Sequence, residues 1–410
     1  MTSANLPLDP RAVRALFPAF AEPDLEGWAF FENAGGSYTA QPVLDRLNAF
    51  YTRTKVQPYA PYPASEAGGA AMDLAHERLA LALGVTADWI HFGPSTTANT
   101  YVLATAVGEW LSAGDAVIVT DQDHEANSGA WRKLAARGIA VREWSADPQT
   151  GHLDPEDLYA LIDDTVRLVA FPHCSNIVGE INPVADIAAR LRAQNIVSVV
   201  DGVSYAPHGL PDVAALGTDI YLFSAYKTYG PHQGVMVIRP EINATLPNQG
   251  HFFNAGLPRK RMTPAGPDHA QIAASAGIAD YLEAVAALAP KTGETNPFRR
   301  AAQAMHDQEQ VLLAPLMDYL KARTDLRLIG PTDPSRRAPT VSIALDEPGV
   351  AAAKRLARHR IMASGGDFYA YRLMQRLGLA PETGVLRVSF VHYTTPGEVD
   401  RLIAALDAEL

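Results

Sequence analysis

"YLFSAYKTYG", residues 221–230, holds a single lysine among apolar, aromatic and small residues. It continues the run from Asp219 to Phe223, and a short apolar run of this kind is typical of a buried strand. Lys227 falls just past the end of that strand. Because lysine is rarely buried unless it is paired or used for chemistry, the stretch predicts a strand that delivers Lys227 to a functional site.

Five further strand-like runs flank this stretch. They are WIHFG (89–93), DAVIVTD (115–121), TVRLVAFPH (165–173), VSVVD (197–201) and GVMVIRP (234–240). Helical patterns at 97–111, 125–138 and 183–195 separate several of them. Strands that alternate with helices predict an α/β fold, in which helices cover both faces of a mostly parallel central sheet.

A polar connector, APKTGETNPFRR (289–300), marks a change in the pattern. A long helical stretch at 299–323, the runs TVSIALD (340–346) and GVLRVSFVHY (384–393), and a last helix from Pro396 follow it. This order predicts a smaller C-terminal α/β domain. We therefore expect three parts, namely an N-terminal segment (1–30), a large domain (31–290) and a small domain (291–410).

The bulk composition is that of a soluble globular protein, with 410 residues, 48% hydrophobic and 19% charged. Acidic residues (45) outnumber basic ones (34), which argues against nucleic acid as the main ligand. No apolar run is long enough for a membrane span, and the first residues lack a secretory pattern. The single cysteine, Cys174, excludes an intrachain disulfide and a cysteine metal cluster. We expect a cytoplasmic protein without a metal site.

Polar residues gather at the predicted carboxyl ends of the strands, where sheets of this type bind ligands. They are Ser95, His124, Asn176, Asp201 and Lys227. Asp201 and Lys227 end neighbouring strands, so a carboxylate and an amine are expected in one pocket. Pyridoxal phosphate (PLP) enzymes use such a pair, the lysine as a Schiff base and the carboxylate against the pyridine nitrogen. A structural ion pair between Asp201 and Lys227, or a lysine whose amine extends to the surface, is the alternative.

An anion site is predicted beside this pair. GPSTTANT (93–100) places small and hydroxyl residues between a strand and a helix, where backbone N–H groups attract a phosphate. A plain helix cap is the alternative. Ser224 could add a phosphate ligand, and the imidazole of His124 could stack on the pyridine ring and take part in proton transfer.

The order of these motifs resembles the class V aminotransferase family, whose members include cysteine desulfurases and selenocysteine lyases. The resemblance begins at FFENAGG near residue 30 and ends at LRVSFVHYTTPGEVDRL; between them stand STT, DHEAN, HCSNIVGEINP, VVDG and FSAYKTYGP. It implies the fold-type-I architecture of PLP-dependent transferases and a homodimer with active sites at the subunit interface.

The resemblance also implies a role for individual residues. Lys227 forms the Schiff base, Asp201 pairs with the pyridine nitrogen, and His124 stacks on the ring. Arg387 binds the substrate α-carboxylate, as a planar guanidinium can, and Asn176 lies near the cofactor and this carboxylate. The remaining cofactor-binding residues are Ser95, Thr96, Thr97, Ser204, Ser224 and Tyr226. Many desulfurases have histidine at the position of Tyr226 and glutamine at the position of Ser204.

Two departures from the family pattern bear on the reaction. Desulfurases carry a cysteine in a mobile loop, and the corresponding stretch here, RIMASGGDFYAYRL (360–373), has none. Cys174 lies elsewhere and is interpreted as a buried structural thiol. Gly266 stands where a threonine commonly reaches the partner's phosphate, so that contact is lost or moved to His269.

Three functions therefore remain open. The first is a PLP-dependent enzyme that acts on an amino acid or amine by transamination or by β- or γ-elimination. The second is cysteine desulfurase or selenocysteine lyase activity. The third, a non-catalytic PLP-binding module, is disfavoured by the complete set of Lys227, Asp201 and His124. The sequence does not choose between transamination, elimination and epimerisation, because one Cα carbanion leads to all three.

Overall fold

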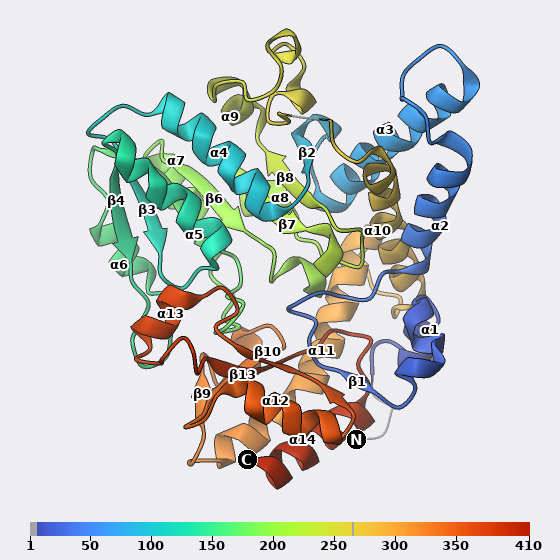
Figure 1. Cartoon of the computed structure of the whole chain (residues 1–410), viewed down its shortest axis with the longest axis vertical. Coiled ribbons are helices and arrows are strands. Elements are labelled where there is room, and N and C mark those ends of the chain that lie inside the picture. Colours follow the sequence, from blue (N-terminus) through green and yellow to red (C-terminus); the bar gives the residue numbers. More distant parts are fainter. Residues whose placement is uncertain (1–5, 265) are drawn as a thin grey trace.

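A computed structural model describes residues 6–264 and 266–410 of the chain. The structure has a large α/β body built on a seven-stranded sheet and a smaller body built on a four-stranded sheet (Figure 1). Their strands fall at 90–238 and 327–389, within the large and small domains expected from the sequence. The domain boundaries themselves stay a prediction. The first five residues of the N-terminal segment, and residue 265 beside Gly266, lie outside the described residues.

The large sheet has the order β2-β8-β7-β6-β5-β3-β4. Neighbours from β7 to β4 pair in parallel, whereas β8 is antiparallel to both β7 and β2, so the mostly parallel sheet is confirmed. The strands are β2 (Ile90–Gly93), β3 (Ala116–Thr120), β4 (Ala140–Trp144), β5 (Val166–Pro172), β6 (Val197–Asp201), β7 (Ile220–Ser224) and β8 (Gly234–Ile238).

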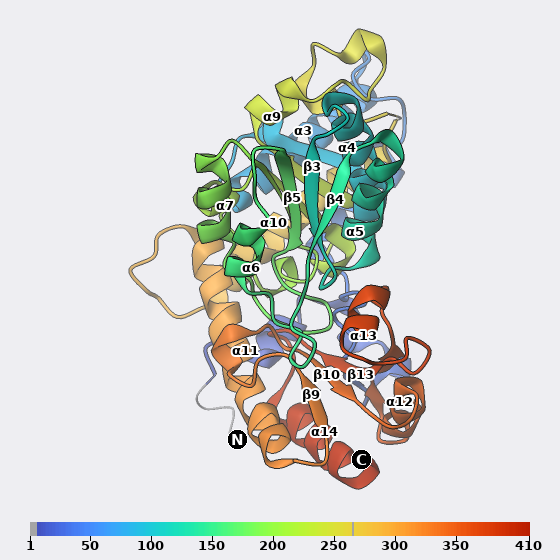
Figure 2. The same cartoon turned by 90° about the vertical axis from the view of Figure 1, so that its left-hand side faces the viewer.

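Both faces of this sheet are buried, which explains why its inner strands are mostly apolar. In β7, Ile220 and Leu222 join the core under one layer of helices, and Tyr221 and Phe223 join the core on the other side. Helices α4 (Thr96–Trp110) and α5 (Glu125–Arg132) cover the first face. Figure 2 shows them opposite α7 (Val184–Ala193), with the sheet between.

Two long helices back the second face. They are α3 (Pro63–Leu83) and α10 (His269–Leu288), and α10 packs against both α3 and α2 (Gln41–Ala49). Ala and Gly residues recur along α10, and a Cβ at Gly277 would lie 2.6 Å from backbone atoms of Val43. Glycine at this position therefore allows α10 and α2 to approach closely.

The small body contains an antiparallel sheet of order β12-β13-β10-β9. Its strands are β9 (Arg327–Ile329), β10 (Thr340–Ala344), β12 (Ser364–Gly366) and β13 (Val385–Ser389). Its helices are α11 (Pro297–Ala322), α12 (Gly349–Arg358) and α14 (Pro396–Glu409), whose apolar faces form its core. Figure 2 shows α11 running from beside the large body down into the small one.

The N-terminal part of the chain packs against the small body. β1 (Ala29–Phe30) pairs in parallel with β11 (Ile361–Met362), and Glu32 forms an isolated bridge with Ser389. The remaining helices are α1 (Pro10–Arg14), α6 (Pro155–Ala160), α8 (Val213–Leu216), α9 (Pro240–Thr245) and α13 (Tyr371–Arg376). Within 6–264 and 266–410, no helix combines the length and apolar character that a membrane span needs.

Candidate active site

A cavity of about 430 Å³ opens at the carboxyl ends of β5, β6 and β7. All ten residues expected to bind the cofactor line it, namely Ser95, Thr96, Thr97, His124, Asn176, Asp201, Ser204, Ser224, Tyr226 and Lys227. They come from five separate loops, which meet because parallel strands end at one edge of the sheet. Arg387, the residue expected to bind the substrate carboxylate, is not among the lining residues, and its surroundings are described below.

Lys227 ends a short 3₁₀ turn that follows β7 directly. Its side chain is buried, and among the described residues no hydrogen bond or ion pair engages its Nζ. Burial and the nearby Arg387 guanidinium lower the pKa of this amine to about 8, against the opposite effect of Asp201 and Glu32. A neutral lysine amine is a nucleophile, so the site keeps part of Lys227 reactive near neutral pH.

Asp201 ends β6 and faces the same cavity. One carboxylate oxygen, Oδ1, accepts a hydrogen bond from the backbone N–H of Val203 at 2.8 Å. Burial raises the pKa of the carboxyl to about 6. A buried carboxylate with one oxygen left toward a cavity is stabilised by a cationic N–H group, such as a protonated pyridine nitrogen.

A second buried carboxyl, Asp123, lies beside Asp201 and was missed by the sequence analysis. It accepts hydrogen bonds from the backbone N–H of His124 at 2.9 Å and from Nδ2 of Asn127 at 2.6 Å. Burial, and next the negative charge of Asp201, raise its pKa well above the ordinary range. The motif DQDHEAN could have indicated Asp123 as a site residue, because it immediately precedes His124 just after a strand.

His124 caps the start of α5, and its Nδ1 accepts a hydrogen bond from the N–H of Ala126 at 3.0 Å. This bond favours the tautomer that carries its proton on Nε2. Burial, followed by the positive charges of Lys227 and Arg387, lowers the pKa of His124 to about 3. The imidazole is therefore neutral at physiological pH, a state that suits a ring stacked against an aromatic group.

The residues of the predicted anion site lie together at the start of α4. Ser95 caps this helix, accepting from the N–H of Ala98 at 3.1 Å, and the hydroxyls of Thr96 and Ser224 lie 2.8 Å apart. A Cβ at Gly234 would come within 2.3 Å of the Ser95 backbone, so only glycine lets β8 lie this close to the helix start. Hydroxyls and free N–H groups at a helix N-terminus fit a phosphate.

Arg387 is central in β13, and both terminal nitrogens of its buried guanidinium are engaged by the protein itself. Its Nη2 forms an ion pair with Glu32 Oε1 at 2.7 Å, and its Nη1 donates to the carbonyl oxygen of Asn176 at 3.1 Å. The Phe368 ring covers the guanidinium, with 3.7 Å between its centroid and Cζ. Glu32 and Phe368 are two neighbours that the sequence analysis did not identify.

Phe368 and Tyr369 belong to the segment 363–371, part of the stretch that the sequence analysis compared with the mobile loop of desulfurases. Asn176 Nδ2 donates to the Phe368 carbonyl at 3.0 Å, and the Tyr369 carbonyl accepts from the N–H of Glu125 at 2.8 Å. The Tyr369 ring lines the cavity and lies 5.2 Å from the His124 ring. The segment thus closes over the cavity and brings no thiol to it.

Cys174 is buried at the start of the loop that follows β5. Its Sγ donates a weak hydrogen bond to the Gly179 carbonyl at 3.3 Å. Burial raises the pKa of the thiol to about 12. Since the thiolate is the reactive form of cysteine, burial disfavours reaction at Cys174, although the residue lines the cavity.

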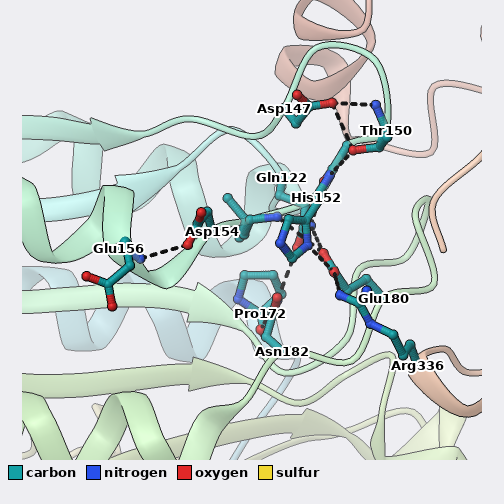
Figure 3. A network of polar contacts seen from close by, with 12 residues as sticks. Gln122, Asp147, Thr150, His152, Asp154, Glu156, Pro172, Glu180, Asn182 and Arg336 are labelled. Carbon is teal, nitrogen blue, oxygen red and sulfur yellow. Dashed lines mark hydrogen bonds and ion pairs between the residues drawn. The ribbon is translucent and has the colours of Figure 1, made fainter.

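A buried carboxylate anchors the loop that carries Asn176 (Figure 3). Glu180 lies further along this loop and accepts a hydrogen bond from Gln122 Nε2 at 3.1 Å. His152 Nδ1 contacts the same carboxylate, and Arg336 of the small body approaches it at 3.5 Å. Contacts from three segments therefore fix the loop and, with it, the position of Asn176.

The residues present fit PLP. The helix start and hydroxyls fit its phosphate, the second oxygen of Asp201 fits its ring nitrogen, and the unpaired Lys227 amine fits its aldehyde. The neutral ring of His124 lies at the edge of the same cavity. Among the described residues, no cluster of His, Cys, Asp and Glu suits a metal ion.

Comparisons with known proteins show the family of the chain. A family model described as "Aminotransferase class-V" matches residues 29–402. The chain is 35% identical to the "Aminotransferase-like protein FGM3" of Gibberella zeae, over 97% of this chain and 98% of that protein. It is 28% identical to a cysteine desulfurase of Serratia proteamaculans, over 96% of each chain.

Solved structures show the same fold. A cysteine desulfurase from Thermococcus onnurineus superimposes with a TM-score of 0.84 at 22% identity, over 100% of this chain and 99% of that one. A cysteine desulfurase from Escherichia coli gives a TM-score of 0.79, also at 22% identity, over 98% of each chain. The fold-type-I architecture implied by the sequence is confirmed.

Proposed function

Because the chain belongs to the class V aminotransferase family, whose enzymes depend on PLP, we propose that it converts an amino acid or a related amine through a covalent link at Lys227. The observation that carries this proposal is the buried Lys227 amine, which has no partner among the described residues and a lowered pKa. It lies in one cavity with Asp201 and with the anion site at the start of α4.

PLP, when bound, supplies an electron sink for the carbanion formed at the substrate Cα. Asp201 would hold the ring nitrogen in its protonated form. Thr96 and Ser224 would bind the phosphate, with Ser95, Thr97, Ser204 and Tyr226 around it. His124 would stack on the ring, and Lys227 Nζ would take up and return the substrate proton, as an amine of pKa near 8 can.

Arg387 and Asn176 are proposed to hold the substrate end that lies away from the phosphate. Oδ1 of Asn176 is buried and has no hydrogen-bond partner among the described residues. An unsatisfied acceptor in a cavity wall favours a ligand donor beside it. The Arg387 guanidinium is the nearby cation, and Coulomb interaction links it to both Lys227 and His124.

Desulfuration is the second candidate function, because several relatives and structural neighbours are cysteine desulfurases. Persulfide transfer needs a thiolate that reaches the substrate sulfur. The segment 363–371 has no cysteine, and Cys174 is buried with a raised pKa. We therefore favour transamination or direct elimination over persulfide chemistry.

Replacing Cys174 by serine should leave most of the turnover intact, because the buried thiol takes no part in the proposed reaction. Wild type and variant would be screened against amino acids, with 2-oxo acid, ammonia and sulfide measured in parallel. An inactive Cys174→Ser variant with a normal cofactor spectrum, together with a persulfide trapped on wild-type Cys174, would replace this proposal by the desulfurase one.

We further propose that two copies of the chain associate. A projecting segment between α9 and α10 exposes Phe252 (87%), Phe253 (69%) and Leu257 (48%), and Figure 1 shows it standing clear of the large body. Large exposed aromatics are typical of interfaces.

The single unpaired cysteine suits a reducing compartment, and we propose that the protein lies in the cytoplasm. Whether Gly266 or His269 contacts the partner's phosphate stays a prediction.

Wild-type protein should sediment as a dimer, and the double variant Phe252→Ser/Phe253→Ser should dissociate more easily. Loss of a central aromatic contact costs about 2 kcal/mol or more, which weakens association roughly 30-fold. Sedimentation velocity over a dilution series measures the change. A wild-type monomer that is fully active at high dilution would refute the proposed assembly.

A further inference from the structure

Arg387 is the cation expected to receive a substrate carboxylate, yet it is already bonded to a carboxylate of its own chain. Glu32 Oε1 lies 2.7 Å from Nη2, and Arg387 is only 2% exposed. The pair combines residues 355 positions apart, one after β1 and the other in β13. A negative charge at this distance cancels most of the attraction that the guanidinium would exert on an incoming anion.

The backbone around Glu32 is shaped to keep this contact. The residue is tied to β13 by its bridge with Ser389, and Ala34 donates to the Ser389 hydroxyl at 2.8 Å. A Cβ at Gly35 would lie 2.6 Å from Glu32 Oε1, so a glycine at this position leaves the space that the carboxylate occupies. The φ angle of Gly35 is not in the left-handed region. Glycine is therefore needed here for the space that a side chain would fill, and not for a turn of the backbone.

The pair borders the cavity without lining it, since Arg387 bonds to the backbone of Asn176, a residue of the cavity wall. Glu32 acts electrostatically on Lys227, opposing the effect of Arg387. Two buried atoms of the pair, Oε2 of Glu32 and Nε of Arg387, have no hydrogen-bond partner among the described residues. This end of the site therefore offers an unused acceptor as well as an unused donor, and its two charges sum to zero.

We infer that Glu32 is a specificity-determining residue, which competes with a substrate carboxylate for Arg387 and so lets the site accept amines that lack this group. The inference rests on the proposed function, since it concerns which amine reaches Lys227. An α-amino acid must share Arg387 with Glu32 or displace it, whereas the corresponding amine leaves the ion pair intact. The two should consequently bind wild-type enzyme with similar affinity.

The test compares two probes that differ only in the carboxylate, L-serine and ethanolamine, on the cofactor-loaded enzyme. Binding is followed by the change in absorbance of the bound cofactor, and the ratio of the two dissociation constants is the readout. Glu32→Gln removes the competing charge at nearly constant shape. It should shift the ratio toward L-serine by about tenfold to a hundredfold, the range for one charge-assisted hydrogen bond.

Two further variants isolate the cause. Gly35→Ala keeps both charges but crowds the Glu32 carboxylate away from Arg387, so it should shift the ratio in the same direction. Glu22→Gln makes the same charge change at an exposed position of the same N-terminal region and should not alter the ratio. Both readouts are binding measurements, and they are independent of which reaction follows.

The inference is overturned if the ratio is unchanged in both site variants, or if Glu32→Gln weakens L-serine binding alone. The latter result would mean that Glu32 orients Arg387 for the carboxylate. A wild-type enzyme whose absorbance responds to neither probe, and in which borohydride does not fix the cofactor to Lys227, would instead overturn the proposed function, and this inference with it.

Discussion

Lys227→Ala should abolish covalent attachment of the cofactor and lower turnover by at least two orders of magnitude. The variant loses the amine that links to the cofactor and, with it, the group that moves the substrate proton. A positioned proton-transfer group contributes about 10²–10⁴-fold to rate. Mass spectrometry after borohydride reduction should place the cofactor on Lys227 in wild type and find no adduct in the variant.

Lys291→Ala is a matched control, because it removes an exposed lysine of the connector before α11. Its cofactor adduct and its turnover should equal those of wild type.

The pH dependence of cofactor uptake gives a second check. Because the neutral amine reacts, the rate of cofactor uptake by the apoprotein should rise with pH and level off above about pH 8. With a lysine of the ordinary pKa, 10.5, the rate would still be rising at that pH. Wild-type protein that takes up PLP while Lys227 stays unmodified would refute the assignment.

Asp201→Ala should still permit attachment of the cofactor but slow turnover severely, because the ring nitrogen loses its anionic partner. Loss of one member of a buried charged pair costs roughly 2–5 kcal/mol. The expected rate loss is therefore on the order of a hundredfold or more. Pre-steady-state measurement of Cα–H exchange in deuterated solvent would locate the loss in proton abstraction.

Asp123→Asn is the informative comparison, since Asp123 is an equally buried carboxyl that lines the same cavity. Both of its oxygens accept hydrogen bonds from neighbouring groups, whereas Asp201 has only one so engaged. Asp123→Asn should therefore cost less than Asp201→Ala. The opposite order would show that Asp123 faces the ring nitrogen and that Asp201 is structural.

Much of the site could be predicted because its residues follow strands. Lys227, Asp201 and His124 each stand just past an apolar run, and parallel strands bring their ends together whatever the intervening sequence. The edge strand β4 was missed for a related reason. It is half exposed and carries Arg142 and Glu143, so it lacks the apolar run that marked the inner strands.

Residues that reach the site from distant segments were not visible in the sequence. Glu32 meets Arg387 only because β1 and β11 pair, which places the start of the chain beside the small body. Phe368 and Tyr369 enter through a loop in which both adopt positive φ angles of 50° and 60°, a conformation that no local pattern announces. The ion pair and the loop closure are products of tertiary packing.

Cys174 has a practical consequence for attaching a label to the segment 363–371. The chain has one cysteine, and its buried, protonated thiol reacts slowly with maleimides. A second cysteine introduced at the exposed Tyr371 would then be the one fast-reacting thiol, with no need to remove the native one. A fluorophore attached there would report any change in the surroundings of the segment when amines are added.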